Sequence, residues 1–386
     1  MANSSFHGFD KFSVQSALME SKNEQDAIVS FSSFPVFMGC VETPPKEDVF
    51  SPMYWKIEND AIVVRPILDS SLVYLDNHNE VVGETWAAHH QEFASFVLKN
   101  KLGESIYEVG GAHGLLSIEA NKTESIKWCI HDINPRPLEQ YKGEVVHGKF
   151  RANQQISKDY STIVHSHTLE HVNDPYGFMR EISLSQNIGD IQILSIPNMD
   201  LMVKRADLNF LNFEHNYFLT RYRVHQILQE TGYRILCEDD FRSHSIFIAA
   251  VLDSKNINGF VTNREQNLIV ERQLILNYVN QCEIKVNRLN QAMSRFKGEI
   301  YVFGSHIFTQ FLIAFGLDTQ RLTYCLDNSS SKRGKRLYGT PLVSYKPEEK
   351  LIQGKVQMVV GSIAGYEAEV RAQLSSLNSN VSLEFC

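Results

Sequence analysis

Apolar and polar positions alternate through the middle of the chain in a way that predicts strands regularly separated by helices. Short apolar runs typical of strands include IYEVG, IKWCIHD, STIVHSH and IQILSIP, and amphipathic stretches such as PLEQYKG, PYGFMREISLSQ and YRVHQILQETG lie between them. YRILCED and SIFIAAVLD then predict a closing pair of strands. Such alternation favours a mainly parallel sheet covered by helices on both faces, so residues 101–253 are expected to form a doubly wound α/β domain.

Three other segments flank this domain. Residues 1–100 are expected to form an N-terminal arm and cap region: residues 1–45 give weak signals, short runs such as AIVVRPIL predict a few strands within 50–74, and residues 85–100 predict an amphipathic helix. Residues 254–296 carry apolar positions at near-helical spacing and predict a helical linker. Residues 297–386 repeat the arrangement of strand, glycine turn and helix, which predicts a second, smaller α/β domain.

Composition narrows the class of protein. Of 386 residues, 43% are hydrophobic and 21% are charged, which is typical of folded globular domains. The net charge of -8 argues against nucleic-acid binding, which needs clustered Lys and Arg. No window approaches the roughly 18 apolar residues of a membrane span, and the first residues lack the apolar segment of a signal peptide. A cytoplasmic protein that binds no membrane is expected.

The cysteines predict neither disulfides nor a metal site. The six cysteines are Cys40, Cys129, Cys237, Cys282, Cys325 and Cys386. They lie far apart and no two form a CxxC pair, so neither a thiolate zinc site nor any other metal is predicted.

A glycine-rich turn carries the first candidate chemistry. Gly110, Gly111 and Gly114 follow a predicted strand, and Glu108 stands two residues before the first glycine. A strand that runs through glycines into a helix brings backbone N–H groups close to a ligand at the carboxyl edge of the sheet. The dinucleotide fingerprint G-x-G-x-x-G needs another spacing, so the turn departs from the NAD pattern. An ordinary tight turn with a solvated Glu is the alternative without a ligand.

The spacing of Glu108, Gly110 and Gly114 resembles the E/D-x-G-x-x-x-G turn of class I S-adenosylmethionine (SAM) methyltransferases. A carboxylate there can complement the ammonium and sulfonium of that cofactor. Asp132 ends the next predicted strand, 22 residues after Gly110, where a carboxylate can accept both hydroxyls of a ribose. The string IVHSHTLEHVNDPYGFMREI (163–182) resembles the fourth strand and following loop of the same family.

A closer resemblance is to the sugar C-methyltransferases. It is carried by SIPNMD (195–200), by the FEHNYF segment within LNFEHNYFLTRYRVHQILQETGYRI (211–235), and by the predicted C-terminal α/β domain. The resemblance implies a Rossmann-like methyltransferase sheet plus a smaller α/β domain that binds substrate, with SAM as cofactor. Its implied acceptor is a sugar or nucleotide-activated sugar-like small molecule, as in polysaccharide or natural-product biosynthesis. Members of that family usually begin with a small zinc domain held by cysteines, but the corresponding region of this chain retains only Cys40. This chain also has Asn212 where a Tyr is usual in the family.

The resemblance also assigns residues to the site. His215 is the expected base, because a neutral imidazole can accept a proton from the acceptor, and Glu214 could hold the imidazole or bind a sugar hydroxyl. The residues expected on the cofactor side are Glu108, Gly110, Gly111, Gly114, Asp132, Phe150 and His167. The residues expected on the substrate side are Asn212, Tyr217, Tyr222, Gly304, His306 and Asp327.

Several alternatives stay open at this level. The acceptor atom could be carbon or oxygen, and the second domain could grip the substrate or only support the first. A two-domain NAD-dependent oxidoreductase would need G-x-G-x-x-G, which neither EVGGAHG nor VFGSHIF supplies. A non-catalytic methyltransferase-like scaffold would have a cofactor crevice that does not bind SAM.

Overall fold

The computed structural model describes residues 12–14, 27–75, 84–151, 160–254, 264–363 and 367–386. The chain packs into two compact units, each built from separate stretches of sequence. One contains Glu80–Leu201 and His215–Asn263, and the other contains Met1–Asn79, Met202–Glu214 and Arg264–Cys386. These units group the chain differently from the predicted domains: helix 85–100 falls with the central sheet, and the long helix after it falls with the second unit.

A seven-stranded sheet forms the centre of the first unit, in the order β11-β12-β10-β9-β6-β7-β8. The strands from β6 to β10 are parallel, and β12 runs antiparallel to both β10 and β11. Their bounds are Ser105–Val109 (β6), Lys127–Asp132 (β7), Glu144–His147 (β8), Thr162–Ser166 (β9), Ile191–Pro197 (β10), Tyr233–Phe241 (β11) and Ser245–Leu252 (β12). This arrangement confirms the predicted doubly wound fold and the closing strand pair.

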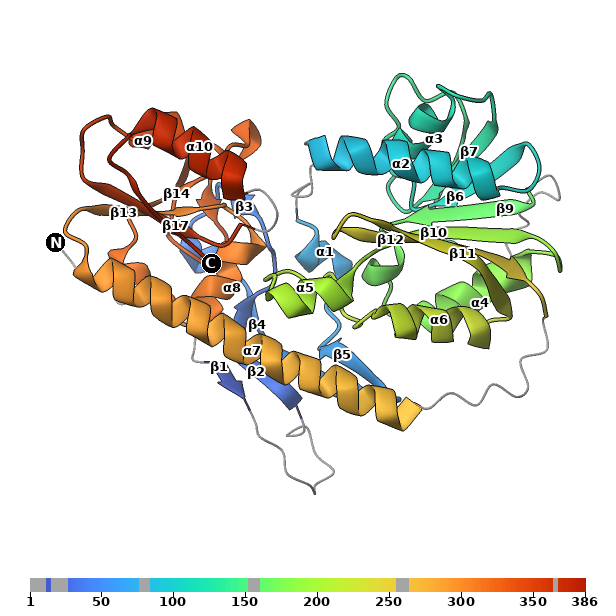
Figure 1. Cartoon of the computed structure of the whole chain (residues 1–386), viewed down its shortest axis with the longest axis horizontal. Coiled ribbons are helices and arrows are strands. Elements are labelled where there is room, and N and C mark those ends of the chain that lie inside the picture. Colours follow the sequence, from blue (N-terminus) through green and yellow to red (C-terminus); the bar gives the residue numbers. More distant parts are fainter. Residues whose placement is uncertain (1–11, 15–26, 76–83, 152–159, 255–263, 364–366) are drawn as a thin grey trace. The chain divides into compact units, whose positions relative to one another are not determined.

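Helices cover both faces of this sheet. Helices α2 (Glu84–Asn100) and α3 (Leu115–Ala120) lie on one face, and α4 (Pro175–Ser185) and α6 (Arg221–Glu230) lie on the other (Figure 1). The sheet is apolar on both faces because each is packed against helices; its core includes Phe93, Trp128 and Phe247. The family's expected α/β layering is therefore present.

The topology locates the place where a ligand should bind. From β6 the chain crosses to β7 on one side, whereas β9 flanks β6 on the other side. In open parallel sheets such a reversal of strand order leaves a crevice at the carboxyl ends of the strands. The loops that follow β6, β7 and β9 all begin at this edge.

The predicted short helix PLEQYKG (137–143) is not formed; this stretch is a turn that leads into β8. The Tyr141 hydroxyl lies 2.7 Å from the Glu144 carbonyl oxygen and 3.2 Å from that of Trp128, so it ties the turn to β7. Long-range contacts thus override the local pattern.

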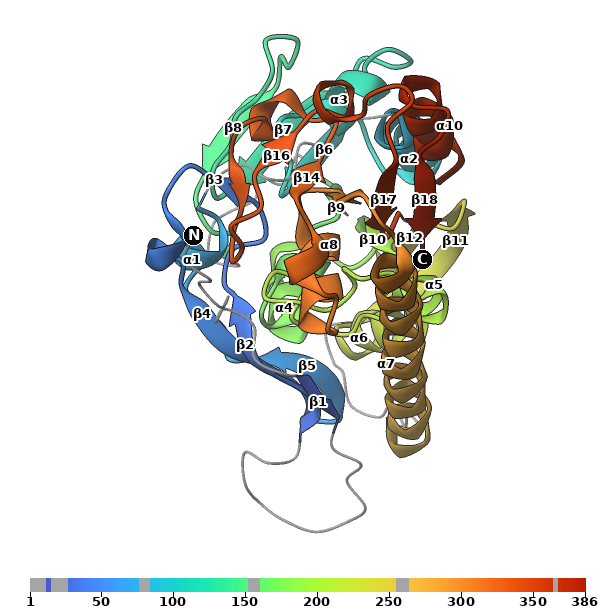
Figure 2. The same ribbon diagram turned by 90° about the vertical axis from the view of Figure 1, so that its left-hand side faces the viewer.

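The second unit begins with an antiparallel sheet, β1-β2-β4-β5 (Figure 2). Its strands are Phe12–Val14 (β1), Ala27–Pro35 (β2), Phe50–Glu58 (β4) and Ala61–Arg65 (β5). The sequence pattern predicted strands within residues 50–74, where β4 and β5 lie, but it predicted an arm before them and missed β2. Phe31 and Trp55 are buried and contact Phe311, and Trp55 also contacts Tyr278. The strand is part of a core, because its aromatic side chains find partners more than 200 residues away in the chain.

A five-stranded parallel sheet, β16-β14-β13-β17-β18, forms the second α/β region. Its strands are Glu299–Phe303 (β13), Tyr324–Leu326 (β14), Ser344–Tyr345 (β16), Gln357–Gly361 (β17) and Ser382–Phe385 (β18). The helices of this unit are α1 (Ser70–Val73), α7 (Arg264–Arg295), α8 (Ile307–Ala314), α9 (Pro347–Lys350) and α10 (Glu367–Leu377). The predicted linker helix is thus a 32-residue helix, α7, that contacts β2, β5 and β18.

A buried ion pair joins two distant parts of this unit. Strand β3 (Cys40–Val41) pairs with β15 (Arg336–Leu337). Both guanidinium nitrogens Nη1 and Nη2 of Arg336 lie 2.6 Å from the carboxylate oxygens of Asp48, whose side chain is only 1% exposed. The Gly339 backbone N–H also donates to Asp48.

A remaining short helix, α5, spans Met199–Arg205, and 3₁₀ turns lie at Pro45–Glu47, Leu169–His171, Thr319–Arg321 and Ser330–Lys332.

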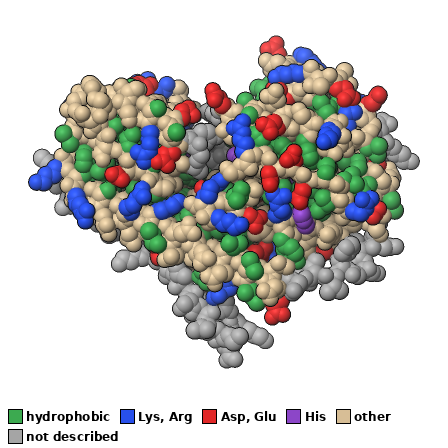
Figure 3. Space-filling model, viewed as in Figure 1, with side chains coloured by type: hydrophobic (Ala, Val, Ile, Leu, Met, Phe, Trp, Pro, Cys, Tyr) green, Lys and Arg blue, Asp and Glu red, His purple; other side chains and the backbone are tan. Residues whose placement is uncertain are grey.

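The surface carries both signs of charge. On the face drawn in Figure 3, Lys and Arg side chains are interspersed with Asp and Glu, and among the described residues neither sign gathers into one patch. None of the helices formed by the described residues combines the length and apolar character that a bilayer crossing requires.

Candidate active site

The glycine turn after β6 is held against the loop that follows β9. Gly110 and Gly114 have φ values of 83° and 73°, in the left-handed region that favours glycine. A Cβ atom on Gly110 would lie 2.3 Å from Thr168 Oγ1, and one on Gly114 would lie 2.6 Å from the Tyr141 ring. The sequence pattern attributed these glycines to a bound ligand. In the structure they are also required by the protein's own packing.

Glu108 lies beneath this turn. Its side chain is 3% exposed, and its Oε2 atom accepts a 2.8 Å hydrogen bond from the Trp128 indole N–H. Burial raises the pKa of Glu108 to about 7, with the nearby Asp132 adding to the rise and the Trp128 bond opposing it. A carboxyl group poised near neutrality can respond to a cation placed in the crevice, since a positive charge favours its ionised form.

The raised pKa of Glu108 predicts a pH-dependent stability. Between the unfolded value of 4.5 and the folded value of about 7, the folded protein binds the extra proton, so stability falls as pH rises through this window. At pH 8.5 the Glu108→Gln variant should therefore be more stable than the wild type by up to about 3 kcal/mol, and near pH 4.5 this advantage should vanish. Chemical denaturation at the two pH values measures the difference. Equal gains at both, or an equal gain in the exposed control Glu139→Gln, would contradict it.

Asp132 lies at the end of β7, beside the glycine turn. Its Oδ2 atom accepts from the backbone N–H of Ala112 at 3.1 Å, and its Oδ1 atom accepts from that of Asn134 at 2.7 Å. The residue is partly exposed. Each carboxylate oxygen has a further lone pair, so Asp132 can still accept hydrogen bonds from a ligand in the crevice.

The loop after β9 carries a buried carboxylate. His167 has a φ of 48°, and its Nδ1 atom lies 2.9 Å from Glu170 Oε1. Because an ionised carboxylate only accepts, His167 donates this bond through Nδ1–H. The Nε2 atom of His167 lies 2.9 Å from Ser245 Oγ of β12. His167 is thus fixed from both ring nitrogens, and it holds Glu170 in turn.

Glu170 is surrounded by histidines. It is 1% exposed, and burial alone would raise its pKa, but His167, His171 and His215 outweigh burial and lower it to about 2. The rings of His171 and His215 meet edge to face with centroids 4.7 Å apart. A carboxylate ionised at neutral pH therefore lies beside two imidazoles.

The position of His215 is set by its neighbours along the chain. Asn216 Nδ2 donates a 2.6 Å hydrogen bond to Asn173 Oδ1, which joins the FEHNYF segment to the loop after β9. The Tyr217 ring lies 6.5 Å from that of Tyr176. Two loops that are about 40 residues apart in sequence are thereby brought to one place, and the predicted base lies beside Glu170.

The structure contains a second cluster of histidines that the sequence analysis did not predict. The rings of Trp86, His89, His167 and His244 lie within 4.8 to 5.7 Å of one another. His89 is fully buried, its Nε2 atom lies 2.9 Å from Ser195 Oγ, and burial lowers its pKa strongly. The contacts of Trp86 and His89 with His167 could not be inferred from spacing alone.

Two other predicted site residues have different surroundings. Phe150 is buried, and its ring lies 5.5 Å from that of His131 and 6.3 Å from that of Phe178. It packs within an aromatic cluster beside β7. Tyr222 lies in the first turn of α6, and its buried hydroxyl has no hydrogen-bond partner among the described residues. Their roles toward cofactor or substrate stay predictions.

The remaining predicted residues belong to the second unit. Asn212 Oδ1 accepts from the Glu214 backbone N–H at 2.7 Å, and both side chains are buried. Asp327, which ends β14, accepts from the backbone N–H of Ser305 at 2.8 Å and lies 3.1 Å from Lys332 Nζ. Although burial would raise its pKa, Lys332 contributes to a net lowering.

The turn after β13 has the same construction as the turn after β6. Gly304 has a φ of 97°, and His306 caps α8 by accepting from the Phe308 N–H through Nδ1. Burial lowers the pKa of His306 to about 4. The acid at the end of the neighbouring strand, Asp327, supports this turn as Asp132 supports the first one.

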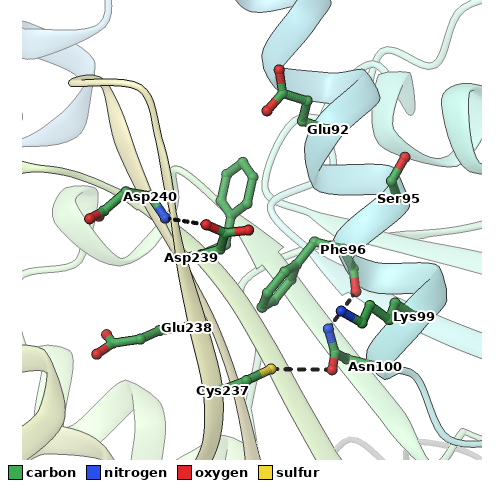
Figure 4. Close-up of a pocket in the computed structure, with 10 residues that line it drawn as sticks. Glu92, Ser95, Phe96, Lys99, Asn100, Cys237, Glu238, Asp239 and Asp240 are labelled. Carbon is green, nitrogen blue, oxygen red and sulfur yellow. Dashed lines mark hydrogen bonds between the residues drawn. The ribbon is translucent and has the colours of Figure 1, made fainter.

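A groove between α2 and β11 contains none of the predicted site residues. Figure 4 shows Cys237 and Asp239 of β11 on the side of α2, whereas Glu238 and Asp240 point away from it, and Cys237 Sγ lies 3.2 Å from Asn100 Oδ1. Glu238 is held by Arg221 and His225. The groove is not part of the candidate active site, because none of the predicted site residues lines it.

Comparison with solved structures gives weak likenesses. A SAM-dependent methyltransferase from Clostridium acetobutylicum is 11% identical, with a TM-score of 0.34 over 44% of this chain and 92% of the other. A magnesium protoporphyrin IX methyltransferase from Synechocystis, solved with bound SAH, is 17% identical, with a TM-score of 0.34 over 46% of this chain and 90% of the other. At these TM-scores the likenesses carry no conclusion about activity. No curated protein sequence matches the chain.

The sequence itself matches a family model. Residues 79–238 match the methyltransferase domain, a stretch that contains the glycine turn, Asp132, the loop with Glu170 and the FEHNYF segment. The match covers less than half of the chain. The resemblance to sugar C-methyltransferases and the role of the C-terminal region remain predictions. Residues 79–238 of this enzyme are a methyltransferase domain.

Proposed function

We propose that this protein transfers the methyl group of SAM to a sugar or a nucleotide-activated sugar-like small molecule. The observation that carries the proposal is the crevice edge at β6 and β7. There the Gly110 to Gly114 turn, the poised carboxyl of Glu108 and the accepting carboxylate of Asp132 lie together within the methyltransferase domain. The cofactor is SAM.

Each residue has a role that its surroundings support. Asp132 accepts hydrogen bonds from the ribose hydroxyls through the lone pairs that Ala112 and Asn134 leave free. Glu108 lies close enough to the turn to complement the positive charge of the cofactor, which would lower its pKa on binding. The backbone of the turn approaches the cofactor because its glycines lack side chains.

His215 is the proposed base. It is partly exposed, whereas the neighbouring Glu170 is buried and ionised, so the imidazolium formed by proton uptake would be stabilised by a nearby negative charge. The loop that holds Glu170 also holds Thr168 against Gly110, which links the base to the cofactor turn by direct packing. The proton would come from carbon beside a ketone or from a hydroxyl. The sugar acceptor, polysaccharide biosynthesis and a cytoplasmic location are part of this proposal.

Calorimetric titration tests the proposal. Purified full-length protein is titrated in parallel with SAM, S-adenosylhomocysteine and NAD. We expect the two adenosyl ligands to bind at micromolar or tighter affinity and NAD not to compete with them. Binding of NAD alone would favour an oxidoreductase, and binding of none would favour a scaffold. SAM binding would be followed by a screen of nucleotide-linked sugars for methyl acceptance.

The Asp132→Ala variant is expected to bind SAM more weakly by about 1 to 3 kcal/mol, because hydrogen bonds to a charged group are lost. Calorimetry measures the change in the dissociation constant. Glu139→Ala, which removes an exposed acid from the following turn, serves as the control and should leave affinity unchanged. Equal affinities for wild type and Asp132→Ala would remove Asp132 from the cofactor site.

A further inference from the structure

Three side chains beside the glycine turn could share one cation. A carboxylate oxygen of Glu170 and one imidazole nitrogen from each of His171 and His215 all lie within 4.8 Å of one another. Glu170 and His171 come from the 3₁₀ turn after β9, and His215 comes from the FEHNYF segment. The fold therefore assembles this set from two loops, and the Asn216 to Asn173 hydrogen bond holds the loops together.

The state of Glu170 is the second observation that points to a ligand. Its Oε1 atom is held by His167, but its Oε2 atom is buried and has no hydrogen-bond partner among the described residues. A buried carboxylate oxygen without a donor is unfavourable, because its hydration is lost and nothing replaces it. The oxygen belongs to the same group of side chains as the two imidazoles. A cation bound there would satisfy it.

We propose that Glu170, His171 and His215 form a binding site for a divalent transition-metal ion such as Zn²⁺. Two imidazoles and one carboxylate are a ligand set used by zinc, and three protein ligands leave a fourth position open. Mg²⁺ and Ca²⁺ prefer oxygen ligands and are not expected to bind. The His167 contact to Glu170 Oε1 provides the outer support that orients metal-binding carboxylates.

The ligand atoms must move slightly inward to hold the ion. At Zn–N distances of about 2.0 Å, tetrahedral ligand atoms are separated by roughly 3.3 Å. Since the ligand atoms lie within 4.8 Å of one another, their largest separation exceeds this value by at most about 1.5 Å. His171 and His215 are only partly buried, so rotation of their side chains can supply this movement. Glu170 is already fixed by His167.

The ion and the proposed base exclude each other. A nitrogen of His215 that coordinates a metal has no lone pair for a proton. This consequence alone rests on the proposed function: occupancy by Zn²⁺ would inhibit methyl transfer, while the crevice at Asp132 would still bind SAM. Metal binding itself requires only the three side chains, and it departs from the sequence-based expectation of no metal.

Metal titration tests the site. Tag-free full-length protein is treated with a chelator, dialysed, and titrated with Zn²⁺ in competition with a chromophoric indicator. The wild type should bind one Zn²⁺ that excess Mg²⁺ does not displace. Since outer-shell partners alone are worth 10 to 100-fold in metal affinity, loss of a direct ligand in His171→Ala should weaken binding by at least about 100-fold. Glu170→Gln should have a similar effect. His225→Ala, which removes a histidine from α6, is the matched control and should bind as the wild type does.

The outcomes separate the two proposals because SAM is titrated on the same samples. Zinc affinity that is equal in the wild type and in His171→Ala would overturn the metal site. So would a wild type that binds SAM but no zinc. Protein that binds zinc at this site but no SAM would overturn the proposed function alone. Circular dichroism checks that each variant is folded.

Discussion

Replacing His215 by alanine is expected to reduce methyl-transfer turnover about 100-fold or more while leaving SAM affinity nearly unchanged, as for the loss of a general base. The imidazole lies beside buried Glu170, and the other partly exposed imidazole of this group is that of His171. Turnover is measured with the acceptor found in the nucleotide-sugar screen, and a chelator is present so that the ion-free protein is assayed.

His225→Ala is the control for this experiment as well, because it removes a histidine that pairs with Glu238 outside the site. Its turnover should match that of the wild type. A parallel loss of SAM binding in His215→Ala would identify His215 as a structural residue of the loop. Unchanged turnover would direct attention to His171, its partner in the edge-to-face contact.

Replacing Asp48 by alanine is expected to destabilise the second unit by about 3 to 5 kcal/mol, because Arg336 would be left as a buried charge without its partner. The pair is bidentate, and the side chains of Arg336 and Asp48 are 7% and 1% exposed. Amide hydrogen exchange in β2 and β4 measures the loss. Exchange in β6 and β10 of the other unit should change little.

Glu47→Ala is the matched control, since Glu47 is an exposed acid next to Asp48 in the chain and should change stability by less than about 0.5 kcal/mol. If Asp48→Ala leaves exchange in β2 unchanged, the strand is not held by this ion pair. The outcome bears directly on β2, whose sequence pattern predicted an arm and whose structure is a strand of a packed sheet.

The centre of the main sheet was readable from sequence because strands β6, β9 and β10 are largely buried and each is followed by a helix. Strand β10, for example, is a run of seven buried residues, and the N-cap of α6 is Thr220, whose side chain accepts from the Arg223 N–H. β2 was missed for the opposite reason. The partners of its Phe31, Trp55 and Phe311, lie elsewhere in the sequence, so the local sequence pattern does not show that the strand is buried. The turn at 137–143 was predicted as a helix because its local pattern does not show that the Tyr141 hydroxyl bonds to the Trp128 carbonyl oxygen.

The residues of the candidate site also differ in whether the sequence could predict them. Residues that occupy fixed positions after strands, such as Gly110 and Asp132, can be found from spacing, because parallel strands share a carboxyl edge. Glu170 cannot be singled out among 45 acidic residues by any spacing rule. Its importance comes from burial and from the histidines that two loops bring around it, and both depend on the tertiary structure.

The division of the second unit into three stretches of sequence has a consequence for synthesis on the ribosome. Strands β2, β4 and β5 emerge early, but α7 and α8, which cover Phe31 and Trp55, begin only after residue 263. At about 5 to 20 residues per second, the first of these helices follows β5 by roughly 10 to 40 seconds. During that interval an aromatic surface is exposed on the nascent chain, and the central sheet can fold before this surface is covered. The order of translation therefore completes the strands of the central sheet before the helices that cover β2 and β4 are made.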